Sequence, residues 1–123
     1  MKINSYRDLR VWQAGLDLVE QVYRLTRTFP RQELYGLANQ LQRAAVSVPS
    51  NIAEGHARQH SKEYLQHLAV AQASLAELET RFEIAKRLEY ISAGQLTKIL
   101  ELATSLGKQL YALRNAVQKR ASQ

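Results

Sequence analysis

The sequence predicts an all-α protein folded as an up-down-up-down antiparallel four-helix bundle. Three observations predict this fold: apolar residues recur at alternating spacings of three and four in four segments, the connections between the segments are short, and only 5 Gly and 2 Pro occur in 123 residues. Such a spacing places apolar side chains on one side of a helix. Short connections between long helices make consecutive helices antiparallel. We therefore expect a single domain over residues 1–123, with helices at roughly 6–28, 31–56, 61–90 and 93–119.

The first segment has two apolar stripes. One stripe contains Leu9, Trp12, Leu16, Val19, Tyr23 and Thr26, and the second contains Val11, Leu18, Val22 and Leu25. Together they are wider than a single antiparallel neighbour would need to cover. We expect Phe29-Pro30 to end this helix, because proline cannot continue the hydrogen-bond ladder and restricts the residue before it.

The second segment has one regular stripe with a proline inside it. The stripe contains Leu34, Ala38, Leu41, Ala45, Val48, Ile52 and Gly55. Because the spacing continues beyond Pro49 to Ile52, we expect this proline to kink the helix and not to end it. We expect Gly55 to begin the end of the helix.

The third and fourth segments begin with polar residues that can cap a helix. Ser61 is the expected N-cap of the third helix, whose stripe is Tyr64, Leu68, Ala71, Leu75, Leu78, Phe82, Ala85 and Leu88. Ser92 and Gln95 have the spacing of a capping box at the start of the fourth helix. The stripe that follows contains Leu96, Ile99, Ala103, Leu106, Leu110, Leu113 and Val117.

Composition excludes several classes of protein. The chain has no cysteine, which excludes a disulfide scaffold, a thiolate zinc site and a cysteine nucleophile. No apolar run approaches the ~18 residues that span a bilayer, and the N-terminal residues lack the apolar region of a signal peptide. We therefore expect a cytoplasmic protein with no membrane partner.

The second helix has a polar stripe with few charges opposite its apolar side. It contains Gln40, Arg43, Ser47, Asn51 and Glu54. One interpretation is a polar face in contact with solvent. The alternative is an oligomer interface or an intramolecular polar network, in which Arg43 pairs with Glu54 or Glu77, because a buried guanidinium needs a partner.

Positive charge is concentrated at the two ends of the predicted bundle. The chain carries 17 Lys and Arg against 11 Asp and Glu, a formal charge of +6. The end that holds both termini contains the first group of candidate nucleic-acid-binding residues, Arg7, Arg10, Arg58, Lys62, Arg114, Lys119 and Arg120. The opposite end contains a second basic patch, Arg24, Arg27, Arg31, Lys86 and Arg87. Such a distribution is typical of proteins that bind a phosphate backbone, although a basic surface in contact with solvent alone is the alternative.

The sequence contains no recognisable catalytic or metal-binding constellation. His56 and His60 are four residues apart, but Gly55 and a predicted connection interrupt any helix that would place them together. Glu77 and Glu79 point to different sides of a helix, so they do not form a carboxylate pair. We therefore expect no enzymatic activity, no metal and no cofactor.

Four motifs along the sequence are distinctive. The first two are Tyr6-Arg-Asp-Leu9-x-Val11-Trp12-x-Ala14 and Phe29-Pro30-x-x-Glu33-x-Tyr35-Gly36-Leu37. The most specific is Gln40-x-x-Arg43-Ala44-Ala45-x-Ser47-x-Pro49-Ser50-Asn51-Ile52-Ala53-Glu54-Gly55, and the last is Ser74-Leu75-x-Glu77-x-Glu79-Thr80. Together these motifs resemble the bacterial four-helix-bundle family that is encoded in intervening sequences of 23S ribosomal RNA genes.

The resemblance implies a homopentamer with a basic surface and supplies no catalytic residue. The family is similar to the accessory variability determinant of diversity-generating retroelements, which implies binding to nucleic acid and to a reverse transcriptase. Two hypotheses follow for this chain. The first is a non-catalytic homo-oligomer that binds RNA or DNA without base specificity, and the alternative is a scaffold for a partner protein such as a retroelement enzyme.

Overall fold

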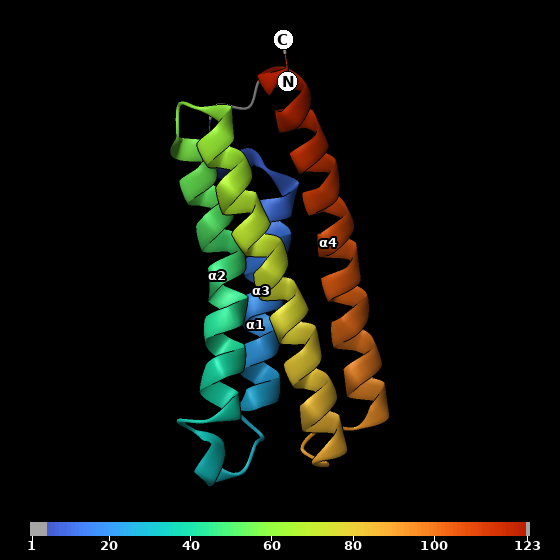
Figure 1. Cartoon of the computed structure of the whole chain (residues 1–123). Helices are drawn as coiled ribbons and strands as arrows, with labels where there is room; N and C mark the ends of the chain where they lie inside the picture. Colours follow the sequence, from blue (N-terminus) through green and yellow to red (C-terminus); the bar gives the residue numbers. More distant parts are fainter. Residues whose placement is uncertain (1–4, 123) are drawn as a thin grey trace.

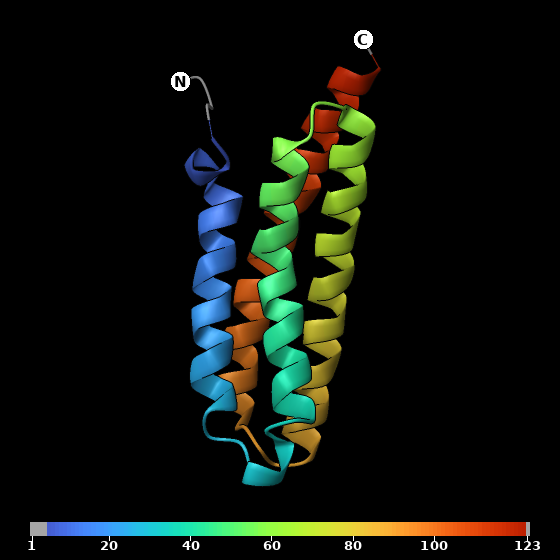
Figure 2. The same ribbon diagram turned by 90° about the vertical axis from the view of Figure 1, so that its left-hand side faces the viewer.

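The computed structural model describes residues 5–122 and contains four long helices. They are α1 (Arg10–Thr26), α2 (Leu37–Ala57), α3 (Ser61–Arg87) and α4 (Ala93–Ala121), and two short 3-10 helices, η1 (Tyr6–Asp8) and η2 (Arg31–Glu33), precede α1 and α2. No strand occurs within the described residues. The long helices run side by side in alternating directions, which confirms the predicted all-α, up-down-up-down bundle (Figures 1 and 2).

Each long helix packs against two others around the bundle. α1 contacts α2 and α4, and α3 contacts the same two helices. The start of α1, the α2–α3 connection and the end of α4 lie at one end, which we call the terminal end (Figure 1). The α1–α2 and α3–α4 connections lie at the opposite end (Figure 2).

α1 faces the core mainly with its second apolar stripe, together with Thr26 of the first stripe. Its buried residues are Val11, Gly15, Leu18, Val22 and Thr26. In the first stripe, by contrast, Leu16 and Tyr23 remain 43% and 42% exposed. The apolar surface of α1 is therefore wider than its neighbours cover, as the two stripes predicted.

The first two helices are shorter than predicted at their starts. α1 begins at Arg10 because Leu9 is extended, with φ −78° and ψ 125°, and this separates the helix from η1. It ends at Thr26, before Phe29-Pro30. α2 begins at Leu37, six residues later than the predicted start at residue 31.

Glu33 explains the late start of α2. Its Oε1 accepts a hydrogen bond from the Leu37 amide at 3.0 Å, so the carboxylate caps the helix. Its Oε2 accepts a hydrogen bond from the Tyr90 hydroxyl at 2.8 Å, which ties this cap to the α3–α4 connection. A Cβ added at Gly36 would lie 2.6 Å from Glu33 Oε1, so glycine makes room for the carboxylate.

α2 continues through Pro49, as the uninterrupted stripe predicted, but Gly55 does not begin its end. Pro49 is buried, and a Cβ added at Gly15 of α1 would lie 3.1 Å from its Cβ. Gly55 is also buried, and α2 continues two residues beyond it to Ala57. A Cβ at Gly55 would lie 2.8 Å from Tyr64 Cδ1, so this glycine allows α2 and α3 to approach closely.

The termini of α3 and α4 agree in part with the sequence prediction. His60, and not Ser61, is the N-cap of α3. The helix ends at Arg87, three residues before the predicted end, and Glu89 has a left-handed φ of 64° in the connection. The capping box at the start of α4 is confirmed, since Ser92 Oγ accepts from the Gln95 amide and Gln95 Oε1 accepts from the Ser92 amide.

The stripes of α3 and α4 supply much of the core. All predicted α3 positions except Leu88 are buried, and α4 contributes Ile99, Ala103, Leu106, Leu110 and Val117. Leu88 is 51% exposed because it lies beyond the last helical residue. None of the helices in the described part of the chain is long and apolar enough to cross a membrane.

Candidate nucleic-acid interface

The first group of predicted basic residues lies at the terminal end of the bundle. Arg7 and Arg10 come from η1 and α1, Arg58 and Lys62 flank the α2–α3 connection, and the remaining three lie on α4 (Figure 1). Six of the seven side chains are exposed, and Arg114 is half-buried. Within residues 5–122, none of the seven forms an ion pair with a carboxylate.

Arg114 differs from the other six because it is used within the bundle. Its guanidinium donates a hydrogen bond to Gln72 Oε1 and so joins α4 to α3. Removal of Arg114 would disturb helix packing as well as charge. The other six define the terminal basic cluster: Arg7, Arg10, Arg58, Lys62, Lys119 and Arg120.

Arg7 lies over two aromatic rings that orient it. Its guanidinium carbon is 5.5 Å from the centroid of Tyr6 and 5.7 Å from that of Trp12. The two rings meet edge to face at 5.2 Å, and Gln13 Nε2 donates to the Arg7 carbonyl at 2.9 Å. A cation held over ring faces keeps its N–H groups at the edge of the guanidinium, where they can reach a phosphate. The sequence places Trp12 in an apolar stripe, and its five-residue separation from Arg7 does not indicate the contact between them.

Tyr64 is a buried polar group close to this cluster. Its side chain is 6% exposed, and among the described residues its hydroxyl has no hydrogen-bond partner. Burial raises the pKa of Tyr64 above its ordinary value, and the positive charge of Arg120 opposes this shift. The Tyr64 ring contacts the edge of His56, with centroids 5.9 Å apart. His56 therefore lies on α2 and packs against Tyr64, although the sequence predicted a connection beyond Gly55.

The second basic patch lies at the opposite end of the bundle. Arg24 and Arg27 are at the end of α1, Arg31 is in η2, and Lys86 and Arg87 close α3. Arg24 donates to Glu20 Oε1 at 2.6 Å, an exposed pair one helical turn apart. The other four form no ion pair within residues 5–122.

Three residues of the polar stripe of α2, Ser47, Asn51 and Glu54, contact polar side chains of α3. Ser74 Oγ donates to Ser47 Oγ at 2.8 Å, and Asn51 Nδ2 donates to the same oxygen at 3.1 Å. The His67 Nδ1 atom lies 3.0 Å from Asn51 Oδ1, and Glu54 Oε2 lies 3.7 Å from the same nitrogen. The intramolecular polar network is thus confirmed for Ser47 and Asn51. Sequence reasoning missed its α3 partners, His67 and Ser74, whose seven-residue spacing places them on one side of that helix.

The predicted pairing of Arg43 within the chain is wrong. Arg43 is exposed, and no ion pair in residues 5–122 includes it. Glu77 Oε2 accepts instead from Arg81, at 2.9 Å and one turn away on α3. Gln40 is likewise exposed and makes no side-chain hydrogen bond within the described part of the chain. A guanidinium that reaches solvent needs no carboxylate, because water solvates it.

The described residues bring no metal-binding group together. Across residues 5–122, three or more His, Cys, Asp or Glu side chains do not gather closely enough to hold an ion. His56 lies on α2, His60 caps α3 and His67 joins the Asn51 network, so the three imidazoles belong to separate environments.

Comparisons with known proteins agree with the bundle and with the motif on α2. The sequence profile of the family described as 23S rRNA-intervening sequence protein matches residues 7–112. A crystal structure of a protein with unknown function from the S23 ribosomal protein family of Bacteroides thetaiotaomicron VPI-5482 superposes with a TM-score of 0.79. It is 24% identical and covers 85% of this chain and 97% of that one. Comparison with curated proteins gives no match.

Proposed function

Since this chain belongs to the 23S rRNA-intervening sequence protein family, we propose that it is a non-catalytic, self-associating cytoplasmic bundle that binds nucleic acid without base specificity. The observation that carries the proposal is the terminal basic cluster, six exposed cations without a carboxylate partner in the described chain. Unpaired Lys and Arg side chains bind phosphate oxygens and release counterions from the polynucleotide.

The placement of the cluster favours contact with phosphates over recognition of bases. Its residues lie at helix ends and beside one connection, and no long exposed helix face concentrates them in the manner of a recognition helix. Phosphate contacts fix position but carry no sequence information. RNA and DNA of mixed sequence should therefore bind with similar affinity.

Self-association would enlarge this basic surface. Leu16 of α1 and Val46 of α2 are 43% and 40% exposed, and Arg43, Ser47 and Val46 border a shallow hollow beside α1. We call Leu16, Val46 and Arg43 the α1–α2 outer face. Two of its three residues are exposed apolar side chains, and Arg43 carries its one charge, a combination that suits contact with another protein surface. A ring of five copies, as the family resemblance implies, would repeat the terminal basic cluster around one axis.

Salt dependence and a charge variant test nucleic-acid binding. Fluorescence anisotropy with a labelled mixed-sequence RNA should give an affinity that falls steeply as salt rises. The triple variant Arg58→Gln, Lys119→Gln, Arg120→Gln should weaken binding and lower the slope of log K against log salt by ~0.7 for each lost contact with a single strand. Lys86→Gln, Arg87→Gln is the matched control at the other end of the bundle. Binding that ignores salt, or an equal loss in the control, would contradict the proposal.

Light scattering tests self-association independently of nucleic acid. Leu16→Glu and Val46→Glu place a charge on the α1–α2 outer face and should lower the molar mass of the nuclease-treated protein. Tyr111→Glu is the control, since Tyr111 is a 62% exposed apolar residue on α4. A monomeric wild-type chain, or a mass unaffected by both charges, would eliminate this interface.

The same face favours the second candidate function, a scaffold for a partner protein such as a retroelement enzyme. A partner helix with apolar residues at three-four spacing would cover Leu16 and Val46 in place of another subunit. A partner recovered from a nuclease-treated extract by the wild-type chain, and lost with Leu16→Glu but not with Tyr111→Glu, would support this function over the first.

A further inference from the structure

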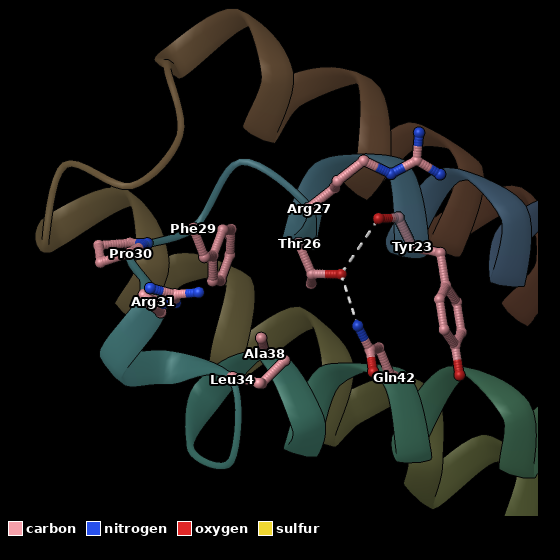
Figure 3. Close-up of a pocket in the computed structure, with 9 residues that line it drawn as sticks. All are labelled: Tyr23, Thr26, Arg27, Phe29, Pro30, Arg31, Leu34, Ala38 and Gln42. Carbon is pink, nitrogen blue, oxygen red and sulfur yellow. Dashed lines mark hydrogen bonds between the residues drawn. The ribbon is translucent and has the colours of Figure 1, made fainter.

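A pocket of about 480 Å³ lies at the opposite end from the terminal basic cluster. The end of α1, the connection through η2 and the start of α2 enclose it (Figure 3). Its walls include Tyr23, Arg27, Phe29, Arg31, Ala38 and Gln42. A volume in this range is typical of sites for small organic ligands.

Two hydrogen bonds of Thr26, one within α1 and one from α2, hold the back wall of the pocket in place. The buried Thr26 hydroxyl donates to the Tyr23 carbonyl at 3.3 Å and accepts from Gln42 Nε2 at 3.0 Å (Figure 3). Gln42 thereby uses its amide nitrogen within the protein. Its side-chain carbonyl has no donor among the described residues and remains an acceptor for a ligand.

The charge of the pocket is positive and uncompensated. Arg27 and Arg31 line different sides of it, both are exposed, and neither forms an ion pair within residues 5–122 (Figure 3). No lining residue is acidic. The neighbouring Glu33 forms no ion pair with either of them within residues 5–122, and its two oxygens accept hydrogen bonds from the Leu37 amide and from the Tyr90 hydroxyl.

The rest of the lining suits a planar group with little charge. Phe29 and Ala38 form a buried apolar floor, 9% and 4% exposed. The Tyr23 ring is 42% exposed and packs against no other aromatic ring in residues 5–122, so its face can stack on a ligand.

We propose that this pocket binds a nucleoside monophosphate, either as a free nucleotide or as the phosphorylated end of a strand. A phosphate monoester carries close to two negative charges at neutral pH, and on binding the exposed side chains of Arg27 and Arg31 turn toward it from different sides of the pocket to neutralise it. A carboxylate would supply only one negative charge. The base lies against Tyr23 and the apolar floor, and Gln42 accepts a hydrogen bond from it. This site is separate from the terminal basic cluster and does not depend on it.

Isothermal titration calorimetry of the 123-residue chain in about 150 mM salt tests the pocket, because that ionic strength screens diffuse surface charge. The ligands are adenosine and uridine monophosphates, adenosine, ribose 5-phosphate, inorganic phosphate and decanoate. We expect saturable binding of a monophosphate, with ribose 5-phosphate and adenosine each at least about ten-fold weaker.

Three arginine variants separate the pocket from general basicity. Arg27→Gln and Arg31→Gln should each weaken monophosphate binding about ten-fold or more, because each removes a charge-assisted contact. Arg24→Gln, one turn away on α1 and paired with Glu20, should leave it unchanged. None of the three side chains is buried, and circular dichroism should show unaltered folding.

The outcomes are distinguishable from those for nucleic-acid binding. The triple variant of the terminal basic cluster should retain full affinity for a monophosphate even where it no longer binds long RNA. A 5′-phosphorylated oligonucleotide that binds through Arg31 more tightly than the free nucleotide identifies a strand end as the source, and the reverse order identifies a free nucleotide. No saturable binding at millimolar ligand, equal affinity for ribose 5-phosphate, tighter binding of decanoate, or an equal effect of Arg24→Gln would overturn the proposal.

Discussion

Three helical glycines differ in how much room surrounds them, and this difference predicts opposite effects of the same substitution. Glycine to alanine in a helix gains ~1 kcal/mol from helix propensity. At Gly107 an added Cβ would meet only Leu75 Cδ1, at 3.9 Å, an ordinary contact. Gly107→Ala should therefore raise the free energy of unfolding by nearly the full amount.

At Gly55 the added methyl group has no room. It would lie 2.8 Å from Tyr64 Cδ1 and 2.9 Å from His67 Cβ, and the Tyr64 ring is only 6% exposed. Overpacking of this kind costs ~1–3 kcal/mol, against the gain of ~1 kcal/mol from propensity. Gly55→Ala should range from neutral to ~2 kcal/mol destabilising, and Gly15→Ala, 3.1 Å from Pro49 Cβ, should lie between the other two.

Urea denaturation followed by circular dichroism measures the series. All variants should be compared at one protein concentration, since self-association would add to apparent stability. In a thermal scan, 1 kcal/mol corresponds to ~4 °C for a domain of this size. If Gly55→Ala stabilises the protein as much as Gly107→Ala, the close approach of α2 and α3 at Gly55 is wrong.

Three further substitutions examine the polar contacts and Arg43. Ser47→Ala removes the acceptor of the buried Ser74 hydroxyl and should lower the free energy of unfolding by ~1–3 kcal/mol. The double variant with Ser74→Ala should lose less than the sum of the two single variants. Strict additivity in this double-mutant cycle would contradict the hydrogen bond. The hydrogen bond from the Leu37 amide, together with that from the Tyr90 hydroxyl, lowers the pKa of Glu33. The unfolded state therefore binds more protons in acid, and the stability that Glu33 contributes at neutral pH is lost as the pH falls through its folded pKa. Glu33→Gln should flatten this acid dependence in denaturation curves measured between about pH 3 and 7. Arg43→Ala should change the free energy of unfolding by less than ~0.5 kcal/mol, because the side chain is exposed and unpaired in residues 5–122. A large loss of stability in a thermal scan would instead support an ion pair of Arg43 within the chain.

The sequence predicted the four helices and their order, because the residues that face the core give each helix its three-four spacing of apolar side chains. It predicted helix ends less well, because those depend on contacts between distant segments. Glu33 sets the start of α2 through a bond to Leu37, and Tyr90, 57 residues away, orients that carboxylate. No local pattern contains this information. The Ser92–Gln95 capping box was predictable for the opposite reason, since both of its hydrogen bonds join residues three apart.

Periodicity also could not decide which of two stripes on α1 faces the core. The stripes contain similar residues, and Gly15 decides between them, because only the side that contains Gly15 allows the backbone of α1 to approach Pro49. The candidate basic residues were placed correctly at the two ends, since an antiparallel bundle fixes the end to which each connection belongs. The side-chain contacts of Arg7 and Arg114 were not predictable, because they join different elements.

The low charge of α2 has two causes that the sequence cannot separate. Toward α3, Ser47 and Asn51 are uncharged because they hydrogen-bond to side chains of that helix in a partly buried space, where a charge would lose its hydration. On the α1 side, Val46 has no such reason, since it is 40% exposed and lies beside the exposed Arg43. Packing within the chain explains why Ser47 and Asn51 are uncharged, but it does not explain the exposed Val46. Contact with a further protein surface would explain an exposed valine here, and this is why substitutions at Val46 and Leu16 discriminate between the proposed functions more sharply than substitutions within the network.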